Sequence, residues 1–118
     1  MSDPWPEELK LRDQGAVLEI KFDTGSVISL TAELLRVESP SAEVKGHGPG
    51  QETTVAGKKN VRIRKLDPVG NYAVRIGFDD GHNSGLYTWN YLLKMGAEKE
   101  ALWTKYLEAL AAKGLSRS

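Results

Sequence analysis

The chain has 118 residues, enough for one ordinary domain with a single hydrophobic core. Its 16 basic and 16 acidic residues cancel to a formal net charge of zero, so the charge of the whole molecule does not attract it to nucleic acid or anionic lipid. It contains no cysteine, which excludes disulfides, thiol catalysis, iron-sulfur ligation and any thiolate zinc site formed by this chain.

Residues 1–8 predict an extended lead-in, because Pro4 and Pro6 stand on either side of Trp5. The indole either packs on the domain or anchors a partner, and the usual burial of tryptophan favours packing. The same residues lack the charged and apolar regions of a signal peptide, and no apolar run has the length of a membrane span. We therefore expect a cytoplasmic protein without a membrane segment.

The next segment predicts a β-hairpin. Residues 15–22 alternate between apolar and charged side chains, and an Asp-Thr-Gly turn at 23–25 leads to a second strand over 26–30. Residues 31–36 then predict one or two helical turns with Thr31 as the N-cap, although the segment is too short for its periodicity to decide.

Residues 39–59 are rich in glycine and proline and have almost no apolar periodicity, which predicts a long loop. A loop of this length inside one domain is uncommon, and both function and disorder account for it, with function slightly favoured. After the loop, residues 61–66 predict a strand with a basic face, residues 67–71 a turn, and residues 72–78 the clearest strand of the chain.

The last third predicts a short strand at 86–88 and two helices. The first covers 89–95 and stops at Gly96 as its C-cap, and the second covers 98–113 with one apolar stripe. Strands followed by helices favour an α+β fold, with a small, mainly antiparallel β-sheet and C-terminal helices packed on one side. The apolar surface of these helices matches what one sheet covers, so we expect a monomer.

The stretch FDDGHNSGLYTW at 78–89 brings together two carboxylates, an imidazole, two glycines and a tryptophan within twelve residues. Asp79 and Asp80 are adjacent, so at a strand end they point to opposite sides and cannot face each other as an acid-base pair. A Ser-His-Asp set drawn from Ser84, His82 and Asp80 lacks a G-x-S-x-G elbow around the serine. The Asp-Gly and Asn-x-Gly pattern favours a tight turn instead.

Metal and phosphate sites have little support in the sequence. His47 and His82 are the two histidines, and neither stands in an H-x-D or H-E-x-x-H pattern. The glycines of 46–50 lack the lysine-serine ending of a phosphate-binding loop. A further basic cluster without interleaved aromatics favours a solvated strand face over nucleic-acid binding, and its members are Lys58, Lys59, Arg62, Arg64 and Lys65.

Three blocks of sequence, LLRVESPSAEV at 34–44, GNYAV at 70–74 and DDGHNSGLYTW at 79–89, resemble the gamma-butyrobetaine hydroxylase-like N-terminal domain family, known also as domain of unknown function 971. The resemblance covers residues 7–114, which we take as the core of a single domain over 1–118. In carnitine-pathway dioxygenases such a domain precedes the catalytic domain, and a similar domain follows the P-loop scaffold of some iron-sulfur carrier proteins. The resemblance therefore implies an accessory module, and it gives no support for hydroxylase activity in this chain.

Family members attached to dioxygenases bind a structural zinc through three cysteines and one histidine. The resemblance places the cysteine positions on Ser39, Ser41 and Val44 and the histidine position on His82. A neutral serine hydroxyl is a poor zinc ligand and valine offers no donor, and His47 as a second imidazole would not make up for the missing thiolates, so we expect no zinc. A hydrogen-bond cluster of the serines with His82 is expected in place of the metal.

The leading hypothesis is a non-catalytic accessory or protein-interaction domain without a cofactor, whose working surface combines 46–51 with the turn at 79–85. One alternative is a docking factor in iron-sulfur or metalloprotein maturation, with an iron-sulfur carrier ATPase as its partner. Another is a small ligand-binding protein that uses the region around His82. The candidate binding or interaction residues are His82, Asp80, Ser39, Ser41, His47, Tyr87 and Trp89.

Overall fold

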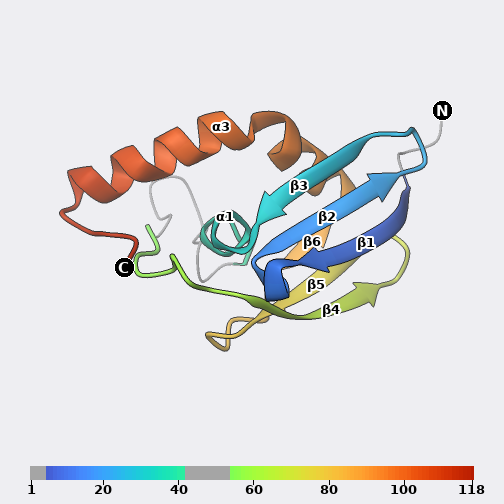
Figure 1. The fold of residues 1–118 in the computed structure, drawn as a ribbon, viewed down its shortest axis with the longest axis horizontal. Helices are drawn as coiled ribbons and strands as arrows, with labels where there is room; N and C mark the ends of the chain where they lie inside the picture. Colours follow the sequence, from blue (N-terminus) through green and yellow to red (C-terminus); the bar gives the residue numbers. More distant parts are fainter. Residues whose placement is uncertain (1–4, 42–53) are drawn as a thin grey trace.

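The computed structural model describes residues 5–41 and 54–118 and begins with an antiparallel three-stranded sheet (Figure 1). Its strands are β1 (Pro6–Arg12), β2 (Val17–Phe22) and β3 (Val27–Thr31), in the order β1-β2-β3. The predicted hairpin is confirmed. The prediction of an extended lead-in to residue 8 missed β1, because the charges along β1 hide the inward-facing Leu9, which packs against the core.

A second antiparallel sheet contains β4 (Ile63–Val69), β5 (Ala73–Phe78) and β6 (Leu86–Thr88) in the order β4-β5-β6. The turn predicted from residue 67 was wrong, because the ladder continues through Pro68, which lies opposite Val74. A proline fits here because β4 is an edge strand of this sheet and needs no N–H on its free side.

Two helices complete the described fold. Helix α1 (Ala32–Val37) begins as predicted, since Thr31 Oγ1 accepts a hydrogen bond of 3.1 Å from the N–H of Leu34. Helix α3 (Trp89–Ala112) is one helix of 24 residues, so the predicted stop at Gly96 was wrong. A Cβ at Gly96 would lie 2.8 Å from Ile28 Cγ2, which shows that this glycine serves the close approach of the helix to β3.

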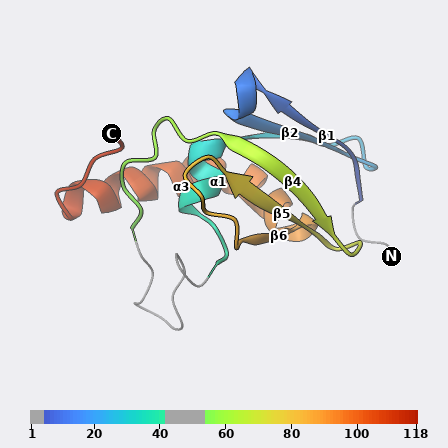
Figure 2. The same cartoon turned by 90° about the horizontal axis from the view of Figure 1, so that it is seen from below.

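Both sheets and both helices contribute to one hydrophobic core. α3 lies on the β3 side of the molecule in Figure 1, and the turned view of Figure 2 shows β1 and β2 apart from β4, β5 and β6. The predicted α+β class is confirmed, with two small sheets and one C-terminal helix where a single sheet and two helices were expected. Within the described residues, no helix combines the length and apolarity needed to cross a membrane.

The connection between β1 and β2 fastens the first sheet to the second. Asp13, Gln14 and Gly15 all have positive φ, at 53°, 59° and 93°. Gly15 is buried so closely against β4 that a Cβ on it would lie 2.5 Å from the carbonyl oxygen of Ile63. Arg62 Nη1 also donates to the carbonyl of Asp13 at 2.6 Å, so this turn is held to the start of β4 at two points.

Candidate functional site

The stretch after β5 forms a tight turn, as its sequence predicts. Gly81 donates its N–H to the carbonyl of Phe78 at 3.1 Å, and Phe78 donates to the carbonyl of His82 at 2.9 Å. Gly81 has a φ of 91°, a conformation that side chains with a Cβ rarely adopt. The turn carries His82 back toward the end of α1.

His82 and Ser39 form a buried hydrogen bond. His82 Nε2 lies 2.9 Å from Ser39 Oγ, and the two residues are 7% and 0% exposed. Ser39 Oγ also accepts the N–H of Ser41 at 3.3 Å, and the hydroxyls of Ser41 and Ser84 lie 2.8 Å apart. The predicted contact between the serine segment and His82 is therefore confirmed, and it joins two segments 43 residues apart in the chain.

Two neighbours complete this cluster. Gly85 allows the turn to pass close to Ser39, because a Cβ at position 85 would lie 2.5 Å from Ser39 Oγ. Tyr87 is fully buried, and its hydroxyl donates to the carbonyl of Leu35 at 2.5 Å. Burial raises the pKa of Tyr87, although a hydrogen bond with the Ser39 side chain acts in the opposite direction. The phenol therefore stays neutral and serves as a structural donor between β6 and α1.

Two further tyrosine hydroxyls hold the ends of the segment that lies outside the described residues. Tyr91 donates to the carbonyl of Glu38 at 2.5 Å, and Tyr106 donates to the carbonyl of Val55 at 2.7 Å. Both donors belong to α3. The helix thus fixes the chain shortly before residue 42 and shortly after residue 53.

Asp80 is the charged centre of the region. Its Oδ2 lies 2.7 Å from Arg36 Nε and 2.7 Å from Lys58 Nζ, while its Oδ1 accepts the backbone N–H of His82 at 3.0 Å. Partial burial alone would raise the pKa of Asp80, but the hydrogen bonds from the two cations and the backbone outweigh it and lower the pKa from 3.8 to about 2. Arg36 Nη1 is buried and has no hydrogen-bond partner among residues 5–41 and 54–118, so within these residues the Asp80 carboxylate is the main compensation for the Arg36 charge.

This geometry predicts an acid-sensitive contribution to stability. Because the folded pKa lies below the ordinary value, the ionised Asp80 stabilises the fold above about pH 4, and the effect is lost as the pH falls toward about 2. The variant Asp80→Asn should lower the urea midpoint at neutral pH and flatten its dependence on pH in that range. Asp67→Asn is the matched control, since the Asp67–Lys65 pair is long at 3.6 Å and exposed. An unchanged acid profile in Asp80→Asn would contradict the assignment.

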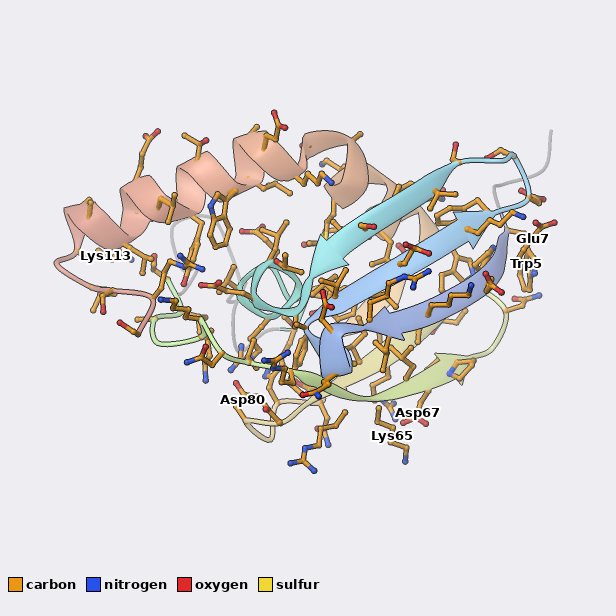
Figure 3. All side chains as sticks on the ribbon, in the orientation of Figure 1. Trp5, Glu7, Lys65, Asp67, Asp80 and Lys113 are labelled. Carbon is orange, nitrogen blue, oxygen red and sulfur yellow. The ribbon has the colours of Figure 1, made fainter. Side chains whose placement is uncertain are left out.

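Of the two remaining candidate residues, only Trp89 lies in the part of the chain that the structure describes, and it lies away from His82. His47 lies outside the described residues. Trp89 stands at the other end of β6, where its Nε1 donates to the carbonyl of Asn71 at 3.2 Å and its ring meets Trp5 edge-on, with centroids 6.4 Å apart. Figure 3 shows Trp5 and Asp80 well apart on the molecule. Asp80 borders a cavity of about 400 Å³ between 57–61 and 117–118, and neither His82 nor Tyr87 lines that cavity.

The Ser39–His82 pair has the separation of a nucleophile and its base but not their surroundings. Ser39 has no exposed surface, so a substrate cannot reach its hydroxyl in this conformation. Asp80 accepts from the backbone N–H of His82, so this carboxylate is not the one that a catalytic triad would place on the imidazole ring. Within the described residues, the cluster forms a buried hydrogen-bond network.

The described residues do not fit a zinc ion. His82 Nε2 is engaged by the Ser39 hydroxyl, and neutral hydroxyls cannot replace the thiolates that zinc prefers. Among residues 5–41 and 54–118, no three histidine, aspartate or glutamate side chains are grouped so that they could hold a metal. Position 44, the third cysteine position of the resemblance, lies outside these ranges.

Several residues at the site were not found by sequence reasoning. Lys58 was placed on a solvated strand face, but it pairs with Asp80, and Arg62 of the same basic set donates to the carbonyl of Asp13. Arg36 was not considered, because its partner Asp80 is 44 residues away and no local pattern links the two. No local pattern in the sequence indicates these contacts.

The model of the family described as gamma-butyrobetaine hydroxylase-like, N-terminal, matches residues 9–93. The chain belongs to this family. No curated protein matches the sequence.

Solved structures similar to this gamma-butyrobetaine hydroxylase-like domain share most of its length. One NMR solution structure is 48% identical with a TM-score of 0.84 and covers 98% of this chain and 86% of its own. A second is 41% identical with a TM-score of 0.84 and covers 99% and 92%. A crystal structure of a protein of unknown function from Acidithiobacillus ferrooxidans, of the DUF971 family, is 39% identical with a TM-score of 0.68 and covers 82% and 100%.

The family membership confirms the resemblance drawn from the three sequence blocks. It assigns no activity, since the Acidithiobacillus relative is itself described as a protein of unknown function. Docking on an iron-sulfur carrier ATPase stays a prediction.

Proposed function

We propose that this gamma-butyrobetaine hydroxylase-like domain is a non-catalytic protein-interaction domain. The observation that carries the proposal is the enclosure of its reactive side chains: Ser39, His82 and Tyr87 are buried and hydrogen-bonded to one another or to the backbone. Groups used in this way hold segments together and are not available to a substrate. What the domain offers to other molecules is therefore its surface.

The surface that best suits a protein partner is an aromatic corner made of Trp5, Tyr72 and Trp89. Trp5 is 47% exposed and Tyr72 is 53% exposed, which is unusual for side chains of this size. Tryptophan and tyrosine are also the residues that most often dominate the binding energy of protein interfaces.

Hydrogen bonds hold the backbone of the aromatic corner and the Trp89 indole in place. Trp5 and Asp23 exchange two hydrogen bonds, Trp5 N to Asp23 Oδ1 at 3.1 Å and Asp23 N to the carbonyl of Trp5 at 2.8 Å. Trp89 is held by its Nε1 bond to Asn71, and its backbone N–H donates to the carbonyl of Tyr72 at 3.3 Å. An anchor that is already ordered loses little entropy on binding, which favours association.

The proposal is tested by affinity purification from the native host with quantitative mass spectrometry. A protein partner should be recovered with the wild-type chain and reduced at least about tenfold with the double variant Trp5→Ala/Tyr72→Ala, as expected when interface anchors are truncated. Leu107→Ala is the matched control, because Leu107 is also exposed, at 40%, but lies 18 positions after Trp89, toward the other end of α3. Recovery of the same proteins at the same level with both variants would overturn the aromatic corner as the binding surface.

The same measurement addresses the identity of the partner. If a carrier ATPase is the partner, it should be among the proteins that the double variant loses. Its recovery at equal levels with every variant would count against that partner.

A further inference from the structure

The segment that follows α3 lies along residues 57–59. The N–H of Gly57 donates to the carbonyl of Ser116 at 3.0 Å, and the N–H of Lys59 donates to the carbonyl of Arg117 at 2.9 Å. These bonds resemble the way in which an extended peptide adds to an exposed strand. Leu115, Ser116 and Ser118 are largely exposed, so Arg117 is the main side-chain anchor of the segment.

The guanidinium of Arg117 is held by a carboxylate and an aromatic ring. Its Nη2 and Nε donate to Glu33 Oε1 and Oε2 at 2.7 and 2.9 Å, which is the two-bond fork that guanidinium forms with carboxylate. Its guanidinium carbon also lies 5.0 Å from the centre of the Trp103 ring. Glu33 is only 6% exposed, so without this cation the helix α1 would carry an uncompensated buried carboxylate.

The site is larger than the side chain that fills it. Beside Arg117, a mainly apolar cavity of about 480 Å³ opens between β3, α1 and α3, with Leu30, Leu34 and Trp103 among its lining residues. This volume is in the range of pockets that bind ligands. The cavity therefore has room for an apolar side chain beside the arginine.

We propose that Glu33, Trp103 and the backbone N–H groups of Gly57 and Lys59 form a binding site for an extended protein segment that carries an arginine and a nearby apolar residue. Residues 115–118 occupy this arginine site as an internal ligand, and an arginine-bearing segment of a partner protein competes with them. Lysine fits less well, because its single ammonium cannot form the fork with Glu33. The arginine site is separate from the aromatic corner and does not depend on it.

The test uses the full chain with the substitution Arg117→Ala, which removes the guanidinium from the site beside Glu33 and Trp103. The probe is a peptide with blocked ends, Leu-Ser-Arg-Ser, which has the sequence of residues 115–118. In an NMR titration the peptide should shift the Trp103 indole and the amides of Gly57 and Lys59. Its affinity for the wild-type chain should be at least about tenfold lower, because the internal segment is present at a high effective concentration. A peptide with lysine in place of arginine should bind about tenfold more weakly than the arginine peptide.

Three controls make the result decisive. Arg117→Lys serves if Arg117→Ala does not fold, since it keeps a cation beside Glu33 and the arginine peptide should still displace it. Glu33→Gln combined with Arg117→Ala should lose the binding, whereas Trp5→Ala/Tyr72→Ala combined with Arg117→Ala should keep it. The proposal is overturned if the folded variant binds no peptide, if both peptides bind equally, or if the shifts appear at Trp5 and Trp89 and not at Trp103.

Discussion

Gly15→Ala is expected to destabilise the domain by about 4 kcal/mol or more, which is a large part of the total stability of a domain of this size. The new Cβ would lie 2.5 Å from the backbone oxygen of Ile63 and 3.2 Å from its nitrogen. Both atoms belong to the main chain at the start of β4, so no side-chain rotation can relieve the contact. The turn would have to leave β4 and lose the bond from Arg62 to Asp13.

The variant Gly25→Ala distinguishes the energetic cost of the contact with Ile63 from the cost of placing a side chain at positive φ. Gly25 has a φ of 90°, almost the same as the 93° of Gly15, but a Cβ there would meet nothing within 4 Å. Its cost should be the strain of a side chain at positive φ, about 1 to 2 kcal/mol. Urea unfolding of both variants, followed by circular dichroism, gives the difference in their free energies of unfolding. Equal losses of this free energy at the two positions would show that the close contact between the turn and β4 does not stabilise the fold.

His82→Ala is expected to cost about 2 to 4 kcal/mol, the second large effect. The change leaves a cavity beside Phe78, whose ring centroid lies 6.1 Å from that of His82, and removes the partner of a fully buried serine hydroxyl. Asn83→Ala, an exposed change in the same turn, should stay within about 0.5 kcal/mol of the wild type.

A double-mutant cycle isolates the contact itself. Ser39→Ala and His82→Ala should be less costly together than the sum of the single changes, with a coupling energy of about 1 kcal/mol for the lost hydrogen bond. Additive losses would mean that the Ser39–His82 contact does not hold the fold.

The sequence predicted those features that depend on neighbours along the chain. The threonine cap at Thr31, the turn at Gly81 and the alternation of β5 each follow from a few adjacent residues, and the structure has all three. The contact between Ser39 and His82 could also be predicted, but only through the resemblance, because nothing in the spacing of the two residues indicates it. The division of the strands into two sheets was not predictable from strand patterns, which do not specify pairing partners across long loops.

The errors concern residues whose role depends on a distant partner. In the sequence Gly96 resembles a residue that ends a helix. In the structure its missing Cβ allows α3 to pack closely against Ile28, which is 68 positions earlier in the chain. Pro68 indicates a turn in isolation, yet it is tolerated because β4 lies at a sheet edge. Asp80 takes its cations from α1 and from residue 58, so the charge balance of the site is a product of tertiary packing.

The tyrosine bonds from α3 also set the spacing of two points that are distant in the chain. Glu38 and Val55 each accept a hydrogen bond from a hydroxyl of the same helix. Because one continuous helix carries both donors, the separation of Glu38 and Val55 is determined by α3, and a displacement of the helix along its axis would move both points together.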